Sequence, residues 1–380
     1  MRRILAICTS HIGGVLLITP AVELLHRYFP EAEISVLVRR GTEAVLENNP
    51  FIKEIYTDGE VTSNQQMHKG TKSSLAKRLS QIPRGLRLIR QLRRQNFDLA
   101  VDFNGGDRAA IYAFLSGARE RVGFKPTGGF LGKASLFTAM YSITEPKHRV
   151  LETAELVSLF AQSRLKAGFD VPKKVGPLVL RPGEKNLRWA EAEWGKESGS
   201  GAPRVLLHPT SRVAYKCWAP AKWAEVVQRF QTNFDAQVMV TCSPDPKEIE
   251  LAKAVLNLCE TRPAERLGTM NLGQLAALIQ CADLFLGVDS APMHIAAAVG
   301  TPVVAVFGPS RDAMWSPWGE NNRVVRRPCS CLDQKKNVCS PEKGMDCMNN
   351  IPSEEVYQTA SEILSARGDR RSKESFTSTI

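Results

Sequence analysis

The chain has 380 residues, of which 43% are hydrophobic and 23% are charged, a composition typical of a soluble globular protein with room for two α/β domains. No stretch approaches the roughly 20 apolar residues that a membrane-spanning helix needs, and the apolar start of the chain stops at Thr9 without a signal-peptide cleavage site. The formal net charge of +11 predicts attraction to anions, whether nucleic acid, a phosphorylated glycolipid or an anionic membrane face.

Short apolar runs that suit buried parallel strands alternate with segments of helical period. Such alternation predicts doubly wound α/β sheets. It breaks at about residues 150–200, where a helix over 151–166 leads into loops rich in Pro, Gly and Ser, so we expect a domain boundary near residue 180. The apolar runs cover residues 4–7, 34–38, 98–102, 205–207, 238–240, 283–286 and 303–306.

The expected domains are therefore residues 1–180 and 181–352. A helix over 353–366 should follow, and the polar tail over 367–380 is expected to be disordered.

Residues 61–97 hold nine Lys or Arg and no Asp or Glu, and they end in the amphipathic run from Leu86 to Arg94. One interpretation is a solvated helix face with a loop. The other is a docking surface for phosphates or acidic lipid headgroups, where each nearby base contributes about 1 kcal/mol. Aromatic residues for base stacking are nearly absent, which disfavours nucleic acid.

The densest motif is the stretch 287–309, in which an apolar strand ends at Gly287 and a helix opens at Ser290 with Pro292 in its first turn. Backbone N–H groups at such a helix start bind phosphate without a metal. Asp289 and Ser290 lie where ligands of open α/β sheets bind, and His294 shares the helix face of Ser290. The alternative is that Asp289 and Ser290 only cap the helix and that His294 belongs to the core.

A second strand end follows Leu207, and a helix begins near Pro220. Thr210 and Ser211 can donate to phosphate oxygens, and Lys216 can stabilise a departing nucleoside diphosphate. Two strand ends of this kind in one domain favour a nucleotide site. No Gly-x-Gly-x-x-Gly follows the first strand and no P-loop is present, which disfavours a dehydrogenase and excludes a P-loop ATPase.

The chain resembles glycosyltransferase family 9, the ADP-heptose lipopolysaccharide heptosyltransferases, over roughly residues 3–366. The resemblance rests on motifs in the family's order, of which the stretch 287–309 is the most specific. The motifs cover residues 13–20, 102–108, 117–124, 216–223 and 288–302.

This resemblance implies a GT-B fold, in which an N-terminal acceptor domain and a C-terminal nucleotide-sugar domain face a central cleft. It implies inverting transfer from ADP-heptose to the lipopolysaccharide inner core without a metal cofactor, by a cytoplasmic protein on the inner face of the inner membrane. The basic segment 61–97 would contact that face, and the helix from Ser353 would pack back toward the N-terminal domain. The implied donor contacts are Thr210, Ser211, Lys216, Asp289, Ser290, Ala291 and His294.

The chain departs from the family at Gly14, which stands where the family has its catalytic Asp. General-base help is typically worth about 10²–10⁴-fold in rate. Three explanations remain open: a non-catalytic sugar-nucleotide binder, a substitute base such as His11 or Asp107, or an altered residue in the sequence.

The nine cysteines are an odd number, which argues against a disulfide framework and favours reduced thiols. Four of them, Cys329, Cys331, Cys339 and Cys347, cluster near the C-terminus. They can close a tetrahedral zinc site in principle, but their spacing lacks the compact Cys-x₂-Cys pair, so free thiols are the default interpretation.

Overall fold

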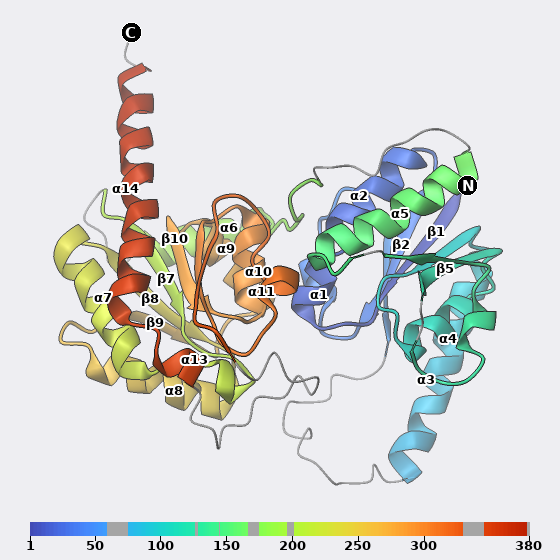
Figure 1. The fold of residues 1–380 in the computed structure, drawn as a ribbon, viewed down its shortest axis with the longest axis horizontal. Helices are drawn as coiled ribbons and strands as arrows, with labels where there is room; N and C mark the ends of the chain where they lie inside the picture. Colours follow the sequence, from blue (N-terminus) through green and yellow to red (C-terminus); the bar gives the residue numbers. More distant parts are fainter. Residues whose placement is uncertain are drawn as a thin grey trace. The chain divides into compact units, whose positions relative to one another are not determined.

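The computed structural model describes residues 1–58, 75–125, 128–143, 145–165, 175–195, 201–329 and 346–377, and for residues 75–84 and 367–377 it describes the backbone alone. The chain forms two compact units, Met1–Arg181 and Pro182–Ile380 (Figure 1). The division falls next to the boundary that the loop composition predicts near residue 180.

Each unit is built on a six-stranded parallel sheet of the same topology. The first sheet has the order β3-β2-β1-β4-β5-β6, and the second has the order β12-β11-β10-β7-β8-β9. In both sheets the strand order reverses between two central neighbours, β1 and β4 in the first and β7 and β10 in the second. Ligands of open α/β sheets bind beyond the carboxyl ends of the strands at such a switch point.

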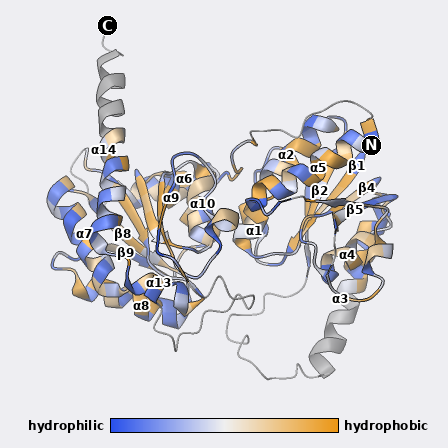
Figure 2. Ribbon diagram, viewed as in Figure 1, coloured by the Kyte–Doolittle hydropathy of each residue, from blue (hydrophilic) through white to orange (hydrophobic). Residues whose placement is uncertain are grey.

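The predicted strands are all present. They are β1 (Arg3–Cys8), β2 (Glu33–Arg39), β4 (Leu99–Asp102), β7 (Arg204–His208), β8 (Gln237–Cys242), β10 (Leu284–Val288) and β11 (Val303–Phe307). Figure 2 shows these strands as predominantly hydrophobic. Strands covered by helices on both faces carry continuous apolar runs, which is why the sequence predicts them.

The strands toward the edges of both sheets were not predicted. They are β3 (Glu54–Asp58), β5 (Glu120–Lys125), β6 (Ala139–Ser142), β9 (Ala264–Leu267) and β12 (Arg323–Arg326). Their side chains are more polar and less buried than those of the central strands. Strands near a sheet edge need no continuous apolar run, so periodicity does not reveal them.

In the first unit, two layers of helices cover the sheet. Helices α3 (Leu75–Arg94) and α4 (Asp107–Leu115) pack on one face, where Leu92 and Ala113 join Leu5 and Ile7 in one buried cluster. Helices α2 (Thr19–Tyr28) and α5 (Arg149–Leu165) pack against each other. The helix predicted over 151–166 is thus confirmed as α5.

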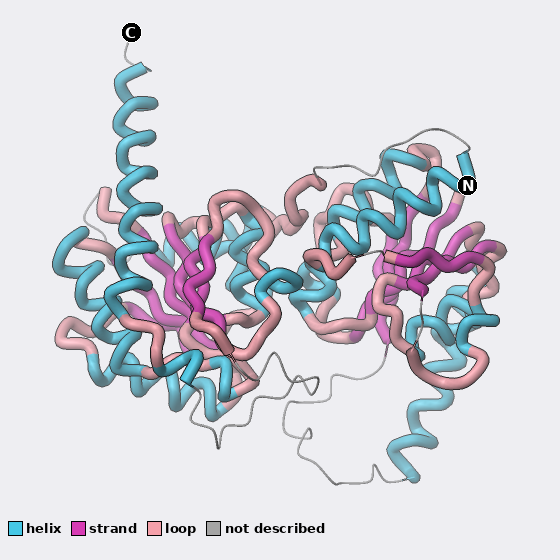
Figure 3. The backbone as a smooth tube through the Cα atoms, in the orientation of Figure 1, coloured by secondary structure: helices cyan, strands magenta, loops and turns pink. Residues whose placement is uncertain are grey.

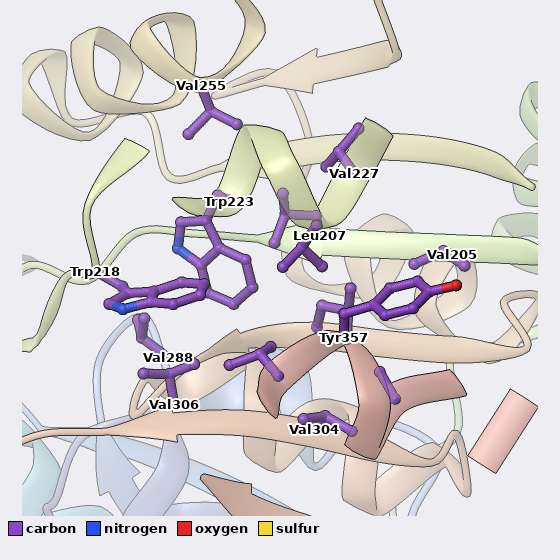
Figure 4. Packing of buried hydrophobic residues seen from close by; sticks show 14 of the residues in the cluster. Val205, Leu207, Trp218, Trp223, Val227, Val255, Val288, Val304, Val306 and Tyr357 are labelled. Carbon is purple, nitrogen blue, oxygen red and sulfur yellow. The ribbon is translucent and has the colours of Figure 1, made fainter. Parts of the chain in front are cut away.

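In the second unit, cyan helices flank the magenta strands in Figure 3. Helices α7 (Pro220–Phe234) and α8 (Pro246–Leu258) pack on each other, and α6 (Glu184–Gly195), α9 (Leu272–Gln280) and α10 (Ala291–Val299) form a further contacting set. Figure 4 shows the core beneath α7, where Trp218 and Trp223 meet edge to face at 4.8 Å between ring centroids. Such an aromatic pair contributes about 0.5–1.5 kcal/mol beyond its buried area.

The C-terminal helix α14 (Ser353–Thr377) contacts α7, β10, β11 and β12, all in the second unit. Tyr357 lies in that unit's core, and its hydroxyl accepts a hydrogen bond from Asn233 Nδ2 at 2.8 Å. These contacts fasten α14 to the sheet of the second unit. The chain is also helical as far as Thr377, whereas disorder was expected from residue 367, because Arg, Lys and Glu favour helix even without an apolar stripe.

Candidate functional site

The donor-site candidates of the second unit gather at the carboxyl ends of β7 and β10, the two strands that flank its switch point. These strands pair directly, with Gly287 opposite His208. A Cβ atom at position 287 would lie 2.8 Å from the backbone oxygen of His208, so only glycine fits there without displacing the neighbouring strand. The loops after both strands therefore leave the sheet side by side.

An ion pair joins the two loops. Lys216, at the end of the short helix η4 (Ala214–Lys216) after β7, donates from Nζ to Asp289 Oδ2 at 2.6 Å. The side chain of Asp289 is only 8% exposed, whereas that of Lys216 is 24% exposed. The ammonium is thus held at the switch point by a buried carboxylate and still reaches solvent.

Helix α10 begins at the same place, directly after Asp289. Ser290 is its N-cap residue, with extended backbone geometry and no side-chain capping bond, and Pro292 lies in its first turn, as predicted. The Ser290 hydroxyl oxygen is buried and has no hydrogen-bond partner among the described residues. The first N–H groups of a helix have no partner within it, so Ala291 and its neighbours can offer backbone donors to an anion. His294, one turn on, is 4% exposed.

Thr210, which is expected to contact phosphate, faces the interior of the second unit. Its side chain is fully buried, and its hydroxyl donates to Glu248 Oε2 at 2.7 Å. Burial lowers the pKa of the neighbouring His208 to about 3, so this imidazole is neutral, and its Nδ1 lies 3.0 Å from Thr241 Oγ1. This buried network beneath the β7 end supports the loop from inside, and spacing alone does not reveal which hydroxyls face inward.

Ser211 is more accessible than Thr210. It is partly exposed, and its hydroxyl oxygen accepts a hydrogen bond of 3.3 Å from the backbone N–H of Val213. Its backbone N–H donates to Cys217 Sγ at 3.3 Å. The hydroxyl proton can therefore be donated outward, as a phosphate contact requires.

In the first unit, the equivalent loop follows β1 and carries His11 and Gly14. His11 is exposed and caps the N-terminus of α1 (Ile12–Leu16), with its backbone oxygen accepting from Val15 N at 3.0 Å. A Cβ atom built on Gly14 would lie 2.4 Å from Ser10 Oγ and 2.8 Å from Ser10 Cβ. Ser10 thus occupies the space that a side chain at position 14 would need.

The neighbouring strand end holds Asp102, the first residue of the motif over 102–108. Asp102 is fully buried at the end of β4, and its Oδ1 accepts from the backbone N–H groups of Asn104 at 2.8 Å and Gly105 at 3.0 Å. Its Oδ2 has no hydrogen-bond partner among the described residues. Burial raises the pKa of this carboxyl to about 6. An acidic residue at the end of a buried strand, before Phe-Asn-Gly-Gly, is the sequence signal that could have indicated its importance.

Asp107, the other candidate substitute base, opens α4. Its side chain is 48% exposed and pairs with the buried Lys133 at 3.3 Å. The ammonium of Lys133 also donates to the backbone oxygens of Gly105 and Gly128. Asp107 is therefore paired with the ammonium that links the Gly105 turn to the Gly128 turn.

The cysteine cluster is only partly described. Cys329 and Cys347 are buried in the core of the second unit, while Cys331 and Cys339 lie outside the described residues. Within the described ranges, no three His, Cys, Asp or Glu side chains come together as a metal would require. The part of the chain that the structure describes also contains no helix long and apolar enough to cross a membrane.

Comparison with known proteins identifies the family. The model of glycosyltransferase family 9 (heptosyltransferase) matches residues 85–344. The chain belongs to glycosyltransferase family 9. A curated relative of this transferase, lipopolysaccharide heptosyltransferase 3 of Escherichia coli, is 30% identical over 318 residues, which cover 81% of this chain and 84% of the relative.

Solved structures confirm the expected GT-B fold of this glycosyltransferase. A family 9 glycosyl transferase from Veillonella parvula superposes with a TM-score of 0.77 and 21% identity, covering 96% of this chain and 98% of that one. The E. coli heptosyltransferase WaaC, solved with ADP, gives a TM-score of 0.71 and 18% identity, covering 95% and 99%. At 21% and 18% identity, these similarities show a shared fold alone.

Proposed function

We propose that this family 9 transferase moves a heptose from ADP-heptose to a hydroxyl of the lipopolysaccharide inner core, with inversion at the anomeric carbon. The Lys216–Asp289 pair at the switch point, next to the open N-terminus of α10, is the observation that carries the proposal. The name of the E. coli relative and the ADP bound to the WaaC structure support the acceptor and the donor, respectively.

The donor diphosphate would lie between the two strand ends of the second unit. Lys216 supplies a positive charge, Ser211 a hydroxyl, and Ser290 with Ala291 the donors at the start of α10. Such fixed donors stabilise negative charge as it develops on a leaving group. Asp289 orients Lys216, and His294 borders the same turn. The arrangement needs no metal to neutralise the diphosphate.

In the proposed reaction, the acceptor oxygen forms a bond to the anomeric carbon as the bond from that carbon to the β-phosphate oxygen breaks. ADP departs with the electron pair of the broken bond. The acceptor hydroxyl proton passes to a base. Attack from the face opposite the leaving group inverts the anomeric configuration.

His11 is the proposed base because the family position for it, Gly14, has no side chain. His11 is exposed at the carboxyl end of β1, beside the switch point of the first sheet. Histidine as a residue type ionises near neutral pH and accepts protons there. Asp107 is less suited, because Lys133 engages its carboxylate.

A second candidate function rests on the same departure. With Gly14 and Ser10 filling the base position, the chain would be a pseudo-transferase that binds the sugar nucleotide and catalyses no transfer. The two functions share the site of the second unit and differ only in turnover.

We place the protein in the cytoplasm at the inner face of the inner membrane, where a lipid-borne acceptor would be met. Segment 61–97 remains the proposed electrostatic contact. Of this segment, residues 61–74 lie outside the described residues, and α3 presents Arg87 and Arg90 on its exposed face. Binding of nucleic acid is not expected.

Incubation of the purified protein with ADP-heptose and heptose-deficient lipopolysaccharide tests the proposal through ADP release and acceptor mass. Transfer by the native chain and its loss in His11→Ala, with His26→Ala on α2 as the matched control, would support His11 as base. If calorimetry shows that ADP-heptose binds but no heptose is transferred, the protein is a pseudo-transferase. If the protein neither binds ADP-heptose nor transfers heptose, the proposed function is overturned.

A further inference from the structure

The turn formed by residues 128–132, Gly-Gly-Phe-Leu-Gly, carries two exposed apolar side chains at its tip. Phe130 is 42% exposed, and Leu131 at 103% is as exposed as in an extended chain. Gly129 and Gly132 both have positive φ, at 117° and 86°, a backbone geometry that glycine adopts at little cost. The turn thus presents Phe130 and Leu131 outward, although burying such side chains is normally favourable.

Helix α4, to which Lys133 ties the turn, carries two further exposed apolar side chains. Ile111 is 41% exposed and Phe114 is 47% exposed, and both follow Asp107 at the i+4 and i+7 positions of one helix face. The turn is fastened to the start of the same helix, because Lys133 Nζ donates to Gly128 O at 2.8 Å and pairs with Asp107 at 3.3 Å. Together, Ile111, Phe114, Phe130 and Leu131 form what we call the apolar surface.

Arginines lie beside the α4 part of the apolar surface. Helix α3 contains no acidic residue, and its described part exposes Arg87, Arg90, Arg93 and Arg94. The end of α3 is tied to the end of α4, because Arg93 Nε donates to Leu115 O at 3.0 Å. The guanidinium of Arg121 lies 5.7 Å from the centre of the Phe114 ring. The region therefore combines exposed aromatic and aliphatic side chains with several arginines, and the acidic Asp107 at its base is paired with Lys133.

We propose that the apolar surface docks the first unit onto an anionic bilayer, with Phe130 and Leu131 inserted among the headgroups and the α3 arginines on lipid phosphates. Apolar tips flanked by bases are what an anionic lipid interface binds. A second copy of the chain would bring like charges against these arginines. The inference deepens the proposed function and rests on it for its biological setting, since an acceptor carried by lipid must be reached at the bilayer.

The apolar surface lies near the carboxyl edge of the first sheet. Lys133 Nζ also donates to the backbone oxygen of Gly105, whose N–H is bonded to Asp102 at the end of β4. The turn over 128–132 is therefore joined through the buried ammonium of Lys133 to the Gly105 turn, which borders the switch point of the acceptor domain. Docking there would hold that turn at headgroup level, where the sugars of a lipid-borne acceptor lie.

Sedimentation of the full-length protein with phosphatidylcholine vesicles, with and without phosphatidylglycerol, tests the proposal. The variant Phe130→Ser with Leu131→Ser should lower the partition coefficient roughly tenfold or more. Leu258→Ser is the matched control, because Leu258 is 53% exposed in the second unit, and it should bind as the native chain does. Arg87→Gln with Arg90→Gln should weaken binding roughly tenfold or more to anionic vesicles alone.

Equal vesicle binding by the tip variant and the native chain would overturn the proposal, as would no binding by the native chain. A concentration-dependent dimer that the tip variant abolishes would assign the surface to a second copy and also overturn it. Turnover with a deacylated, water-soluble acceptor separates this inference from the proposed function. If the native chain binds vesicles but does not turn over this acceptor, the docking surface is supported and transferase activity is refuted. Equal turnover of this acceptor by the tip variant and the native chain would show that the variant folds.

Discussion

The hydroxyl of Ser10 lies 2.4 Å from the point where a Cβ atom of residue 14 would be, so these two positions share one space. Real Cβ atoms do not approach other atoms so closely, and Ser10 Cβ is itself 2.8 Å away. The space that a side chain at position 14 would need is thus filled by Ser10. An aspartate fits at position 14 only if the side chain of Ser10 moves or is removed.

We expect Gly14→Asp alone to change turnover little and Gly14→Asp with Ser10→Gly to raise it. A correctly placed general base is worth about 10²–10⁴-fold in rate, so the double variant should exceed the native turnover by a factor in that range if the native chain lacks a base. ADP release at saturating donor measures it, and Ser10→Gly alone is the control. Identical rates for both Asp-bearing variants would contradict the steric coupling.

Lys216→Gln should lower the turnover of ADP-heptose by about 10²–10³-fold, the usual cost of removing one donor that stabilises developing negative charge. The variant also leaves the 8% exposed Asp289 without its ion-pair partner. Asp289→Asn, which frees the ammonium, should reduce turnover less. Lys253→Gln, an exposed change on α8, is the matched control for net charge. Unchanged kinetics in Lys216→Gln would remove this residue from the donor site.

Thr210→Val should destabilise the second unit by about 1–3 kcal/mol, because the buried Glu248 loses the hydroxyl that donates to it. Thr210→Ser keeps the hydroxyl and should cost less. Urea unfolding followed by tryptophan fluorescence reports on this unit, since Trp218 and Trp223 lie in its core. If Val and Ser variants unfold at the same urea concentration, the bond to Glu248 contributes no stability.

Asp102 should make the protein less stable as pH rises through the range 4–6. Burial raises its folded-state pKa from 3.8 to about 6, against the opposing charges of Lys133 and Arg149, so the folded chain binds the proton more tightly than the unfolded chain does. The stabilisation is present below pH 4 and is lost as pH rises through 6. The shift corresponds to about 3 kcal/mol at most.

Asp102→Asn removes this titration and keeps an oxygen for the N–H groups of Asn104 and Gly105. The free energy of unfolding of the native chain relative to this variant should therefore fall between pH 4 and pH 6. Asp98 provides the opposite case, because hydrogen bonds from the backbone of Arg2, and secondarily Arg3, lower the pKa of its carboxyl. Asp98→Asn should lose stability at neutral pH, and its difference from the native chain should shrink as pH falls through the Asp98 pKa. Parallel profiles for both variants would contradict these assignments.

The central architecture follows from the amino-acid sequence by itself. Continuous apolar runs such as Val303–Phe307 are buried, and the helix-start residues Ser290 and Pro292 mark where α10 begins. These signals are local, because hydrophobic burial and helix initiation depend on neighbouring residues. The family motifs are likewise contiguous, so the GT-B fold could be predicted without coordinates.

Tertiary structure alone decided which of the candidate side chains meet. Residues 216 and 289 are 73 positions apart in the sequence, and only the pairing of β7 with β10 joins them in an ion pair. The inward turn of Thr210 toward Glu248 and the filling of position 14 by Ser10 depend on packing in the same way. Spacing along the chain gives the order of residues, whereas the direction of a side chain and its partner depend on segments that folding brings together from afar.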